Sequence, residues 1–354
     1  MTRLRRLVIE VSNRCNLRCR TCTDRPLNGP IIQPEAFEGI LKKVSSPDDI
    51  ELVRFVGAGE TLLVPYFDEM VARATKAFQD TEVNFFTNGM LLEHRLVESL
   101  LRRNVRAYIT LSMDAATPHV FEYIRRGASF DRILKNIENI GKLKEDYGSR
   151  YPVLKINFTM LKHNVKEIPK MVKLASDLNI AEIVFSQMGV NESIEFARID
   201  QHPFYGDNRK ATKQALLEAR ELAQACGVVV TATWPQVFGW TEQYSDRHEL
   251  AEGLGVELRY EPCVWALSAL LVNIRGDVYP CCRHSTAFGN IKDRDDLIAL
   301  FDSDEAESLR HRLLNGQAVR ECDNCIWYNR YSFRHDNEYY WISESMFGNT
   351  VNIR

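Results

Sequence analysis

The sequence is short of the features that mark membrane, secreted and nucleic-acid-binding proteins. No run approaches the roughly 18 apolar residues that cross a bilayer. The basic start, Met1 to Arg6, leads into a strand-like segment instead of the apolar core of a signal peptide. The net charge is −3 with both signs interspersed, so the chain has no sustained basic stripe and no acidic tail. We therefore expect a soluble cytoplasmic protein that binds neither membranes nor nucleic acid.

The chain does contain enough apolar residues for a large core, and it contains many cysteines. With 354 residues and 45% hydrophobic content, it can bury one large α/β core and a smaller second domain. Its nine cysteines are an odd number and fall into spacings typical of metal ligands. Without a secretion signal, this pattern favours metal ligation in a reducing compartment over disulfide bonds.

Residues 7 to 185 alternate between short apolar runs of β type and amphipathic helical patterns, which is typical of parallel βα units. Because such connections are right-handed, six successive units predict an α/β fold, an open (β/α)6 partial TIM barrel with its active site at the carboxyl ends of the strands. Periodicity alone leaves a flat doubly wound sheet open. The predicted strands are Leu7 to Val11, Leu52 to Val56, Val83 to Thr87, Ala107 to Ser112, Leu154 to Thr159 and Glu182 to Ser186; the predicted helices are Pro34 to Val44, Pro65 to Phe78, Glu93 to Arg102, Thr117 to Arg126, Phe130 to Leu143 and Val165 to Leu178.

Three cysteines at CxxxCxxC spacing follow the first predicted strand: Cys15, Cys19 and Cys22. Tetrahedral zinc sites and cubane iron-sulfur clusters normally take four protein ligands, so a trio with no local fourth leaves one metal position open. The spacing by itself also fits zinc ligands or ordinary buried thiols.

The strand and its three-thiol loop resemble the radical S-adenosylmethionine (SAM) enzymes. Asn13 before the first cysteine and Asn16 after it match residues that are common in the family's cluster-binding motif. The resemblance implies a 4Fe-4S cluster on the three cysteines, with a fourth iron that holds the amino and carboxylate groups of SAM. It also implies cleavage of SAM to methionine and a 5'-deoxyadenosyl radical that abstracts a substrate hydrogen atom. One departure is Thr21, where many members have an aromatic residue that packs over the adenine.

Polar turns after the next three strands add to the resemblance. Gly57-Ala58-Gly59-Glu60 resembles the family's GxGE turn, whose backbone contacts the SAM amino group and whose glycines allow close approach. Thr87-Asn88-Gly89 resembles the TNG turn, and Ser112-Met113-Asp114 is similar to the SxD signature whose side chains approach the ribose or carboxylate of SAM. The resemblance thus implies SAM-binding roles for Gly57, Gly59, Glu60, Thr87, Asn88, Ser112 and Asp114.

Three further polar residues are candidates for SAM binding. Arg125 and Arg126 follow the SxD signature on a helix, where a guanidinium makes a bidentate contact with the SAM carboxylate or simply faces solvent at a helix end. Asn157 in the fifth strand either reaches the ribose or is a satisfied core amide.

A second group of cysteines follows residue 260: Cys263, Cys281, Cys282, Cys322 and Cys325. A hairpin turn at Arg275-Gly276-Asp277 and a CxxC pair beyond a helix near Leu297 to Leu314 suit either a structural zinc ion or a four-iron cluster. The region resembles the SPASM or twitch domain of radical SAM proteins. That resemblance implies the shorter twitch-like form, with one auxiliary 4Fe-4S cluster on Cys263, Cys281, Cys322 and Cys325 and with Cys282 as a spare thiol.

The domain boundaries follow from these patterns. We expect a radical SAM core over residues 1–190, a bridging segment over 191–260, and a small α+β auxiliary-cluster domain with an aromatic tail over 261–354. The bridge contains a predicted helix, Arg209 to Ala225, and a possible strand, Gly227 to Thr233. Cys226, at the end of that helix, is expected to be a small buried thiol.

The resemblance implies SAM cleavage, and several chemical outcomes then stay open. An auxiliary cluster with four protein ligands favours electron acceptance from a substrate radical, and hence dehydrogenation of a sugar, cyclitol or nucleoside. An epimerase needs a thiol hydrogen donor, for which Cys282 and Cys226 are the candidates. The first strand begins within a few residues of Met1, which leaves no room for a fused leader-peptide domain and favours a small molecule over a ribosomal peptide. The remaining alternative is a zinc-binding interaction protein. A radical SAM enzyme would also need a reducing partner such as flavodoxin or ferredoxin.

Overall fold

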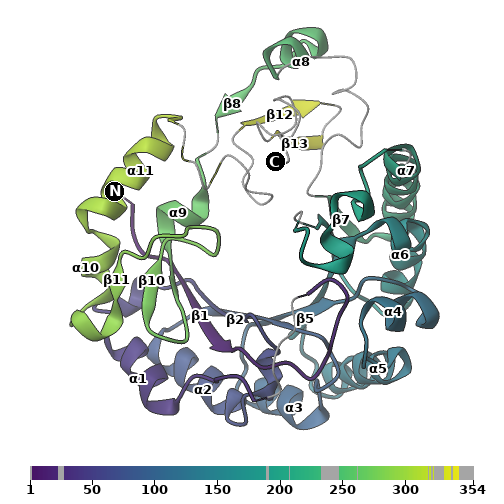
Figure 1. Ribbon diagram of the computed structural model, residues 1–354. Coiled ribbons are helices and arrows are strands. Elements are labelled where there is room, and N and C mark those ends of the chain that lie inside the picture. Colours follow the sequence, from purple (N-terminus) through teal and green to yellow (C-terminus); the bar gives the residue numbers. More distant parts are fainter. Residues whose placement is uncertain are drawn as a thin grey trace.

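The computed structural model describes residues 2–22, 28–188, 191–206, 208–232, 247–260, 262–317, 319, 322, 331–335 and 338–342. Within these residues, one ten-stranded sheet forms the centre of the molecule, and a smaller three-stranded sheet lies across its open side (Figure 1). Of the described helices, none is both long and apolar enough to cross a membrane.

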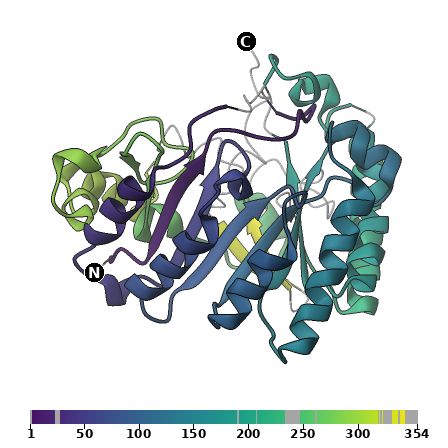
Figure 2. The same ribbon diagram turned by 90° about the horizontal axis from the view of Figure 1, so that it is seen from below.

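Seven neighbouring parallel strands of the large sheet follow chain order from β1 to β7. The sheet curves around its inner face, and the helices cover its outer face (Figures 1 and 2). The predicted open partial barrel is therefore confirmed, and the possible strand expected within the bridge joins it as a seventh parallel strand. These strands are β1 (Arg6–Ser12), β2 (Leu52–Gly57), β3 (Glu82–Thr87), β4 (Ala107–Ser112), β5 (Val153–Met160), β6 (Glu182–Gln187) and β7 (Val229–Ala232).

The main core lies between the outer face of the sheet and the helices. Alternate residues of each strand enter it, as in β5, where every second side chain is buried. A chain of aromatic rings joins the layers: Phe37, Phe55, Phe67 and Phe85 follow one another at ring distances of 6.0, 5.3 and 5.0 Å. The surrounding helices are α1 (Pro34–Lys42), α2 (Phe67–Ala77), α3 (His94–Arg102), α4 (Pro118–Ile124), α5 (Phe130–Asp146), α6 (Ile168–Asp177) and α7 (Asn208–Cys226).

The C-terminal part adds strands to the free edge of the same sheet. Strand β9 pairs in parallel with β1, β10 pairs antiparallel with β9, and β11 pairs antiparallel with β10. Strands β8, β12 and β13 form the separate three-stranded sheet. The elements of this part are α8 (Arg247–Leu254), β8 (Arg259–Tyr260), α9 (Val264–Ser268), β9 (Ala269–Val272), β10 (Asp277–Tyr279), β11 (Gly289–Asn290), α10 (Leu297–Phe301), α11 (Asp304–Leu314), β12 (Tyr331–His335) and β13 (Glu338–Ile342).

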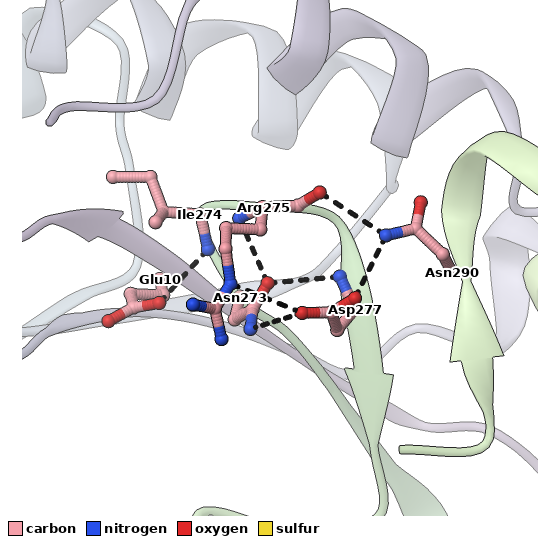
Figure 3. A network of polar contacts seen from close by, with 6 residues as sticks. All are labelled: Glu10, Asn273, Ile274, Arg275, Asp277 and Asn290. Atoms are coloured by element: carbon pink, nitrogen blue, oxygen red, sulfur yellow. Dashed lines mark hydrogen bonds and ion pairs between the residues drawn. The ribbon is translucent and has the colours of Figure 1, made fainter.

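Polar contacts join the β9–β10 turn to the barrel (Figure 3). The Glu10 carboxylate of β1 accepts a 2.9 Å hydrogen bond from the Ile274 backbone N–H in the turn. The Asn273 side chain accepts from the Asp277 backbone N–H at 2.9 Å, and the Asn290 amide donates to the Asp277 carboxylate at 3.0 Å. The hairpin is thus held at a defined position beside β1.

Two details of the sequence-based prediction are corrected here. The single helix predicted near Leu297 to Leu314 is two helices, because the Ser303 side chain accepts the Ala306 backbone N–H and starts α11. Cys226, expected to be buried, is exposed at the end of α7. The predicted hairpin turn is confirmed, and Gly276 adopts a φ of 91° at its tip.

Candidate functional site

A cavity of about 360 Å³ opens at the carboxyl ends of β1 to β4. The cysteine loop after β1 forms one wall, and the turns after β2, β3 and β4 form the others. All three thiols of the loop lie in this lining, as do most of the residues predicted to bind SAM. The lining residues are Cys15, Leu17, Cys19, Thr21, Cys22, Val56, Gly57, Ala58, Gly59, Glu60, Phe86, Thr87, Asn88, Ser112 and Arg125.

Gly57 and Gly59 lie against the backbone of the cysteine loop. A Cβ at Gly57 would lie 2.4 Å from the Ser12 carbonyl oxygen, and a Cβ at Gly59 would lie 2.1 Å from the Arg14 carbonyl oxygen. The Gly59 backbone N–H donates to the Ser12 carbonyl at 3.0 Å, and the Glu60 N–H donates to the Arg14 carbonyl at 2.7 Å. These glycines are therefore required for the cysteine loop to pack on the turn after β2.

The Glu60 side chain ties the turn after β2 to the turn after β3. It is 3% exposed, and its two oxygens accept hydrogen bonds from the Leu62 N–H at 3.1 Å, the Thr87 hydroxyl at 2.6 Å and the Asn88 N–H at 2.8 Å. Burial raises the pKa of the Glu60 carboxyl, and the hydrogen bonds from Thr87, Asn88 and Leu62 oppose that shift. The Glu60 carboxylate thus accepts three hydrogen bonds from protein groups and positions the cavity wall, and Glu60 also lines the cavity, so its role in SAM binding stays a prediction.

Asn88 connects the turn after β3 to the first thiol. Its side-chain amide donates to the side-chain oxygen (Oδ1) of Asn16 at 2.8 Å and lies 4.0 Å from the Cys15 sulfur. The Leu17 backbone N–H is 3.4 Å from the same sulfur. Two donors therefore point at the Cys15 sulfur, the arrangement that stabilises a negatively charged thiolate ligand.

Arg125 and Asp114 form a buried ion pair behind the second thiol. The Arg125 Nε lies 2.7 Å from the Asp114 Oδ2, with side-chain exposures of 11% and 0%. Burial would lower the pKa of Arg125, but the Asp114 carboxylate and the Cys19 thiol raise it above its usual value. Burial raises the pKa of the Cys19 thiol to about 11, although Arg125 opposes that shift. Arg125 is therefore a fixed cation in the wall of the cavity beside Cys19.

Two other arginines hold the cysteine loop from outside. The Arg18 side chain donates to the Cys15 and Leu17 carbonyls at 3.1 and 3.0 Å. The Arg126 side chain donates to the Arg18 carbonyl at 3.1 Å, and the Arg18 N–H donates to the Arg126 carbonyl at 2.9 Å. Arg126 thus clamps the loop and is not among the cavity-lining residues.

Asp114 and Asn157, both predicted to bind SAM, also lie outside the lining. The second oxygen of Asp114 accepts the Thr159 N–H at 2.9 Å, so this carboxylate acts on the cavity through Arg125. The Asn157 side-chain oxygen accepts the Ser186 hydroxyl at 2.6 Å. A protein group therefore occupies that oxygen, although the Asn157 side chain is on the inner face of β5.

The second cysteine group is assembled in part within the described residues. Cys263 precedes α9, and Cys322 follows α11; both pack against one small apolar cluster that contains Ala266, Leu309 and Leu313. Cys281 is partly buried just after β10, and its neighbour Cys282 is exposed. Cys325 lies outside the described residues. Two of the four predicted auxiliary ligands are thus near each other, although 59 positions separate them in the sequence.

The thiols fit a cluster better than a single ion. In the part of the chain that the structure describes, no three His, Cys, Asp or Glu side chains form a site for one metal ion. The first trio instead lines a shared cavity with room for a larger group, and Arg125 and the donors to Cys15 complement anionic ligands. This donor set suits an iron-sulfur cluster, whose sulfur ligands are spread around several irons.

Sequence motifs missed the apolar part of the cavity. Val56 in β2 and Phe86 in β3 line it, each just before a predicted turn. Their neighbours Phe55 and Phe85 are fully buried under the helices, so the alternation of the strands sends Val56 and Phe86 to the inner face. The alternation of side chains along β2 and β3 was the sequence signal that could have identified both residues as facing the cavity.

Two family models match the chain. The model described as the radical SAM superfamily matches residues 9–175, which include every strand and turn that lines the cavity. The SPASM model, described as an iron-sulfur cluster-binding domain, matches residues 263–326, from Cys263 past Cys325.

Curated relatives match over part of their length. The chain is 24% identical over 222 residues to the tungsten-containing aldehyde ferredoxin oxidoreductase cofactor-modifying protein of Pyrococcus furiosus, which is 59% of this chain and 60% of that protein. It is 26% identical over 178 residues to the probable GTP 3',8-cyclase of Methanocaldococcus jannaschii, 49% of this chain and 56% of that protein. With the GTP 3',8-cyclase of Clostridium botulinum, the identity is 31% over 139 residues, 37% of this chain and 42% of that protein. The chain therefore spans about half the length of these relatives.

Solved structures share the fold. Streptococcus suis SuiB bound to S-adenosylmethionine superposes with a TM-score of 0.63 at 17% identity, over 87% of this chain and 68% of that one. Native anSMEcpe with bound AdoMet superposes with a TM-score of 0.59 at 18% identity, over 91% of this chain and 86% of that one. The likeness extends beyond the barrel into the C-terminal part.

Proposed function

We propose that this chain, which belongs to the radical SAM superfamily and carries a SPASM iron-sulfur cluster-binding domain after its barrel, is an enzyme that cleaves SAM to remove a hydrogen atom from a small biosynthetic molecule. One observation carries the proposal: three thiols and the turns after β2, β3 and β4 meet around a single cavity at the carboxyl ends of parallel strands. This is the edge of a βα barrel at which active sites are built.

The residues of the cavity have distinct roles in this proposal. Cys15, Cys19 and Cys22 would hold a 4Fe-4S cluster with one iron open to SAM, and the cluster and SAM together supply a 5'-deoxyadenosyl radical. Arg125, held by Asp114, is the cation in the wall that would pair with the SAM carboxylate. Thr21 and Phe86 line the same cavity and would bound the adenosine.

The backbone around the cavity positions these groups. Gly57, Gly59 and Glu60 fix the turn after β2 against the cysteine loop, and Asn88 reaches the first thiol from the next turn. Ser112, at the end of β4, offers a hydroxyl in the same lining. These groups would orient SAM before substrate arrives, which is how binding energy is used to bring reacting atoms together.

The C-terminal domain would hold an auxiliary 4Fe-4S cluster. Cys263, Cys281, Cys322 and Cys325 are the proposed ligands, and Cys263 and Cys322 already share one apolar cluster. With four protein ligands this cluster would accept the electron of the substrate radical, so the net reaction would be dehydrogenation. We propose residues 1–190 as the core of six βα units, 191–260 as a bridge that adds α7 and β7 to it, and 261–354 as the auxiliary domain.

The proposed substrate class rests on the names of the proteins that this chain resembles. Two curated relatives are named for GTP, a nucleotide, whereas one solved SuiB structure contains a precursor peptide. A small molecule such as a sugar, cyclitol or nucleoside is favoured here, with a peptide as the alternative. A radical epimerase with Cys282 as hydrogen donor is the competing reaction; its support is that the Cys282 thiol lies near enough to the barrel residue Arg54 to raise the pKa of that guanidinium. The other candidate donor, Cys226, lies at the end of α7 just before β7 begins, and so at the opposite edge of the sheet. A reducing partner such as flavodoxin or ferredoxin completes the proposal.

Iron analysis with a SAM cleavage assay tests the proposal. The wild-type protein, reconstituted without oxygen, should contain about eight irons if it holds two four-iron clusters, and it should form 5'-deoxyadenosine with SAM and a reductant. The C15A/C19A/C22A variant should keep about four irons and form none. Cys226→Ala, which removes an exposed thiol at the far edge of the sheet, is the matched control for iron content. Zinc without iron, or a wild type that does not cleave SAM, would instead support a zinc-binding interaction protein.

A further inference from the structure

Arg54 projects from the middle of β2 onto the inner face of the barrel. Its neighbours Val53 and Phe55 are fully buried against the helices, so the alternation of the strand places Arg54 and Val56 on the other face. Val56 lines the thiol cavity. Two residues along a strand span roughly 7 Å, so Arg54 lies within the length of a small molecule from the cavity wall.

The guanidinium of Arg54 lies among aromatic rings and a second arginine. Its central carbon is 4.3 Å from the ring centre of Trp265 in α9 and 5.8 Å from that of Phe86. Arg6 of β1 approaches the same Trp265 ring at 5.9 Å. Figure 1 shows α9 facing β1 and β2 across the inner face of the sheet. Arg54 thus lies between the thiol cavity and the auxiliary domain.

Arg54 has no carboxylate partner among the described residues. Its Nε is inaccessible to solvent and makes no hydrogen bond there. Burial lowers the pKa of the Arg54 guanidinium to about 10; the Cys282 thiol partly opposes this shift and the nearby Arg6 cation adds to it, so the group remains cationic at neutral pH.

Two other cations, one in the cavity wall and one on the inner face, do have carboxylate partners. Arg125 is 2.7 Å from Asp114, and Lys155 of β5 is 2.5 Å from Glu182 of β6. A buried charge without a counter-ion is unfavourable unless something else supplies the opposite charge. Stacking on Trp265 offsets part of this penalty and leaves the edge of the guanidinium, which carries its N–H donors, available to an anion.

Asn84, on the strand next to Arg54, offers a second unused group. Register pairs Arg54 of β2 with Asn84 of β3, so both side chains lie on the inner face. The Asn84 amide donates to the Tyr108 carbonyl at 3.2 Å and the Thr110 hydroxyl at 3.4 Å, whereas its buried side-chain oxygen has no partner among the described residues. An acceptor beside a cation suits a ligand with a hydroxyl or amine near an anionic group.

We infer that Arg54 anchors an anionic group of the substrate, a carboxylate or a phosphate ester, while Asn84 accepts a hydrogen bond from a neighbouring hydroxyl or amine. This inference rests on the proposed function, because it takes the inner face beside the thiol cavity as the place where substrate binds. The substrate carries the counter-ion that the described part of the chain does not provide. Its anionic end faces α9, and its other end reaches the cavity.

Thermal unfolding with simple anions tests the anchor. Inorganic phosphate, succinate and the neutral control glycerol would be titrated into the reconstituted protein at constant ionic strength, and the unfolding midpoint recorded. The wild-type midpoint should rise saturably with phosphate or with succinate, because a ligand that binds only the folded state stabilises it. A stronger response to phosphate indicates a phosphate ester, and a stronger response to succinate indicates a carboxylate.

Three Arg54 variants and one control variant separate anion binding from structural effects. Arg54→Met and Arg54→Gln should abolish the anion response, while the midpoint without anion stays the same or rises, since an uncompensated charge has been removed. Arg54→Lys keeps the charge without the planar fork and should weaken apparent anion affinity by about tenfold. Arg102→Gln, on the exposed face of α3, removes the same charge and should respond as the wild type does.

The results against the anchor are equally specific. An anion response that survives in both Arg54→Met and Arg54→Gln would overturn it, as would a large fall of the midpoint in both without anion, which would make Arg54 a structural partner of Trp265. A wild type that cleaves SAM but shows no anion response would also overturn the anchor and leave the proposed function intact. An Arg54-dependent response in a protein that fails to cleave SAM would contradict the proposed function and leave Arg54 as an anion site.

Discussion

Gly59 and Arg14 pack backbone to backbone, so that a Cβ on Gly59 would lie 2.1 Å from the Arg14 carbonyl oxygen and 2.6 Å from the Arg14 nitrogen. Arg14 immediately precedes Cys15, and the Glu60 N–H donates to the same carbonyl at 2.7 Å. The position of the first thiol therefore depends on the lack of a side chain in a turn that lies 45 positions further along the sequence.

Gly59→Ala should displace the cysteine loop and damage cluster assembly. Backbone atoms are the obstacle, so a small side-chain movement does not relieve the contact. We expect iron content to fall from about eight to about four per chain, and any remaining SAM cleavage to fall by roughly a hundredfold, the effect of an ångström-scale misplacement in an active site. Iron and 5'-deoxyadenosine assays measure both.

The matched control is Gly141→Ala in α5, where a Cβ would meet nothing within 4 Å. It should keep the full iron content and raise the free energy of unfolding by about 0.5–1 kcal/mol, because alanine is the better helix former. Equal iron content in Gly59→Ala and Gly141→Ala would show that the cysteine loop does not need the close approach.

Glu60→Gln should destabilise the fold although it preserves the shape of the side chain. An amide has only one acceptor oxygen, so at least one of the donors from Leu62, Thr87 and Asn88 loses its partner or meets an N–H₂ group. The expected loss in unfolding free energy is about 1–3 kcal/mol, measured by urea denaturation. Glu35→Gln, in the exposed first turn of α1, should cost less, about 0.3–1 kcal/mol, because it loses only a favourable charge at the start of the helix. A stable Glu60→Gln protein with weakened SAM binding would point to direct contact between Glu60 and SAM.

Arg125→Gln should be costly both to stability and to SAM binding. It leaves the fully buried Asp114 without its ion-pair partner, for which a loss of about 3–5 kcal/mol is expected. Asp114→Asn combined with Arg125→Gln should lose less than the sum of the single variants, because the two residues interact directly. Denaturation curves of the four proteins give the interaction energy. Additive losses would contradict the pairing, and the exposed pair Arg102 and Glu98 serves as a control whose removal leaves stability unchanged.

Cys282→Ala distinguishes the two proposed reactions. A dehydrogenase passes the electron of the substrate radical to the auxiliary cluster and should tolerate the change, whereas an epimerase with a Cys282 donor should lose product formation. The readout is product analysis in deuterated water, because hydrogen returned from an exchangeable thiol carries deuterium into the product. Cys226→Ala, at the far edge of the sheet, should leave the product unchanged in either case.

The sequence by itself determined the elements of the barrel and the chemistry of its loops. Strands β1 to β6 were predicted to within about a residue, because alternate side chains that must be buried under helices impose a period of two on the local sequence. The cysteine spacing and the polar turns were visible for a similar reason, since each is confined to a few consecutive residues.

Only the tertiary structure decided which residues that are distant in the sequence contact one another at the site. It placed β9 beside β1, paired the Glu60 and Asp114 carboxylates with other protein groups around the cavity, and placed Arg54 against Trp265. These pairs join residues that lie from 11 to more than 200 positions apart, so they depend on strand register and loop closure, and no local periodicity encodes either. The sequence therefore specified the kind of chemistry, whereas packing decided which residues face the cavity and which ones hold them there.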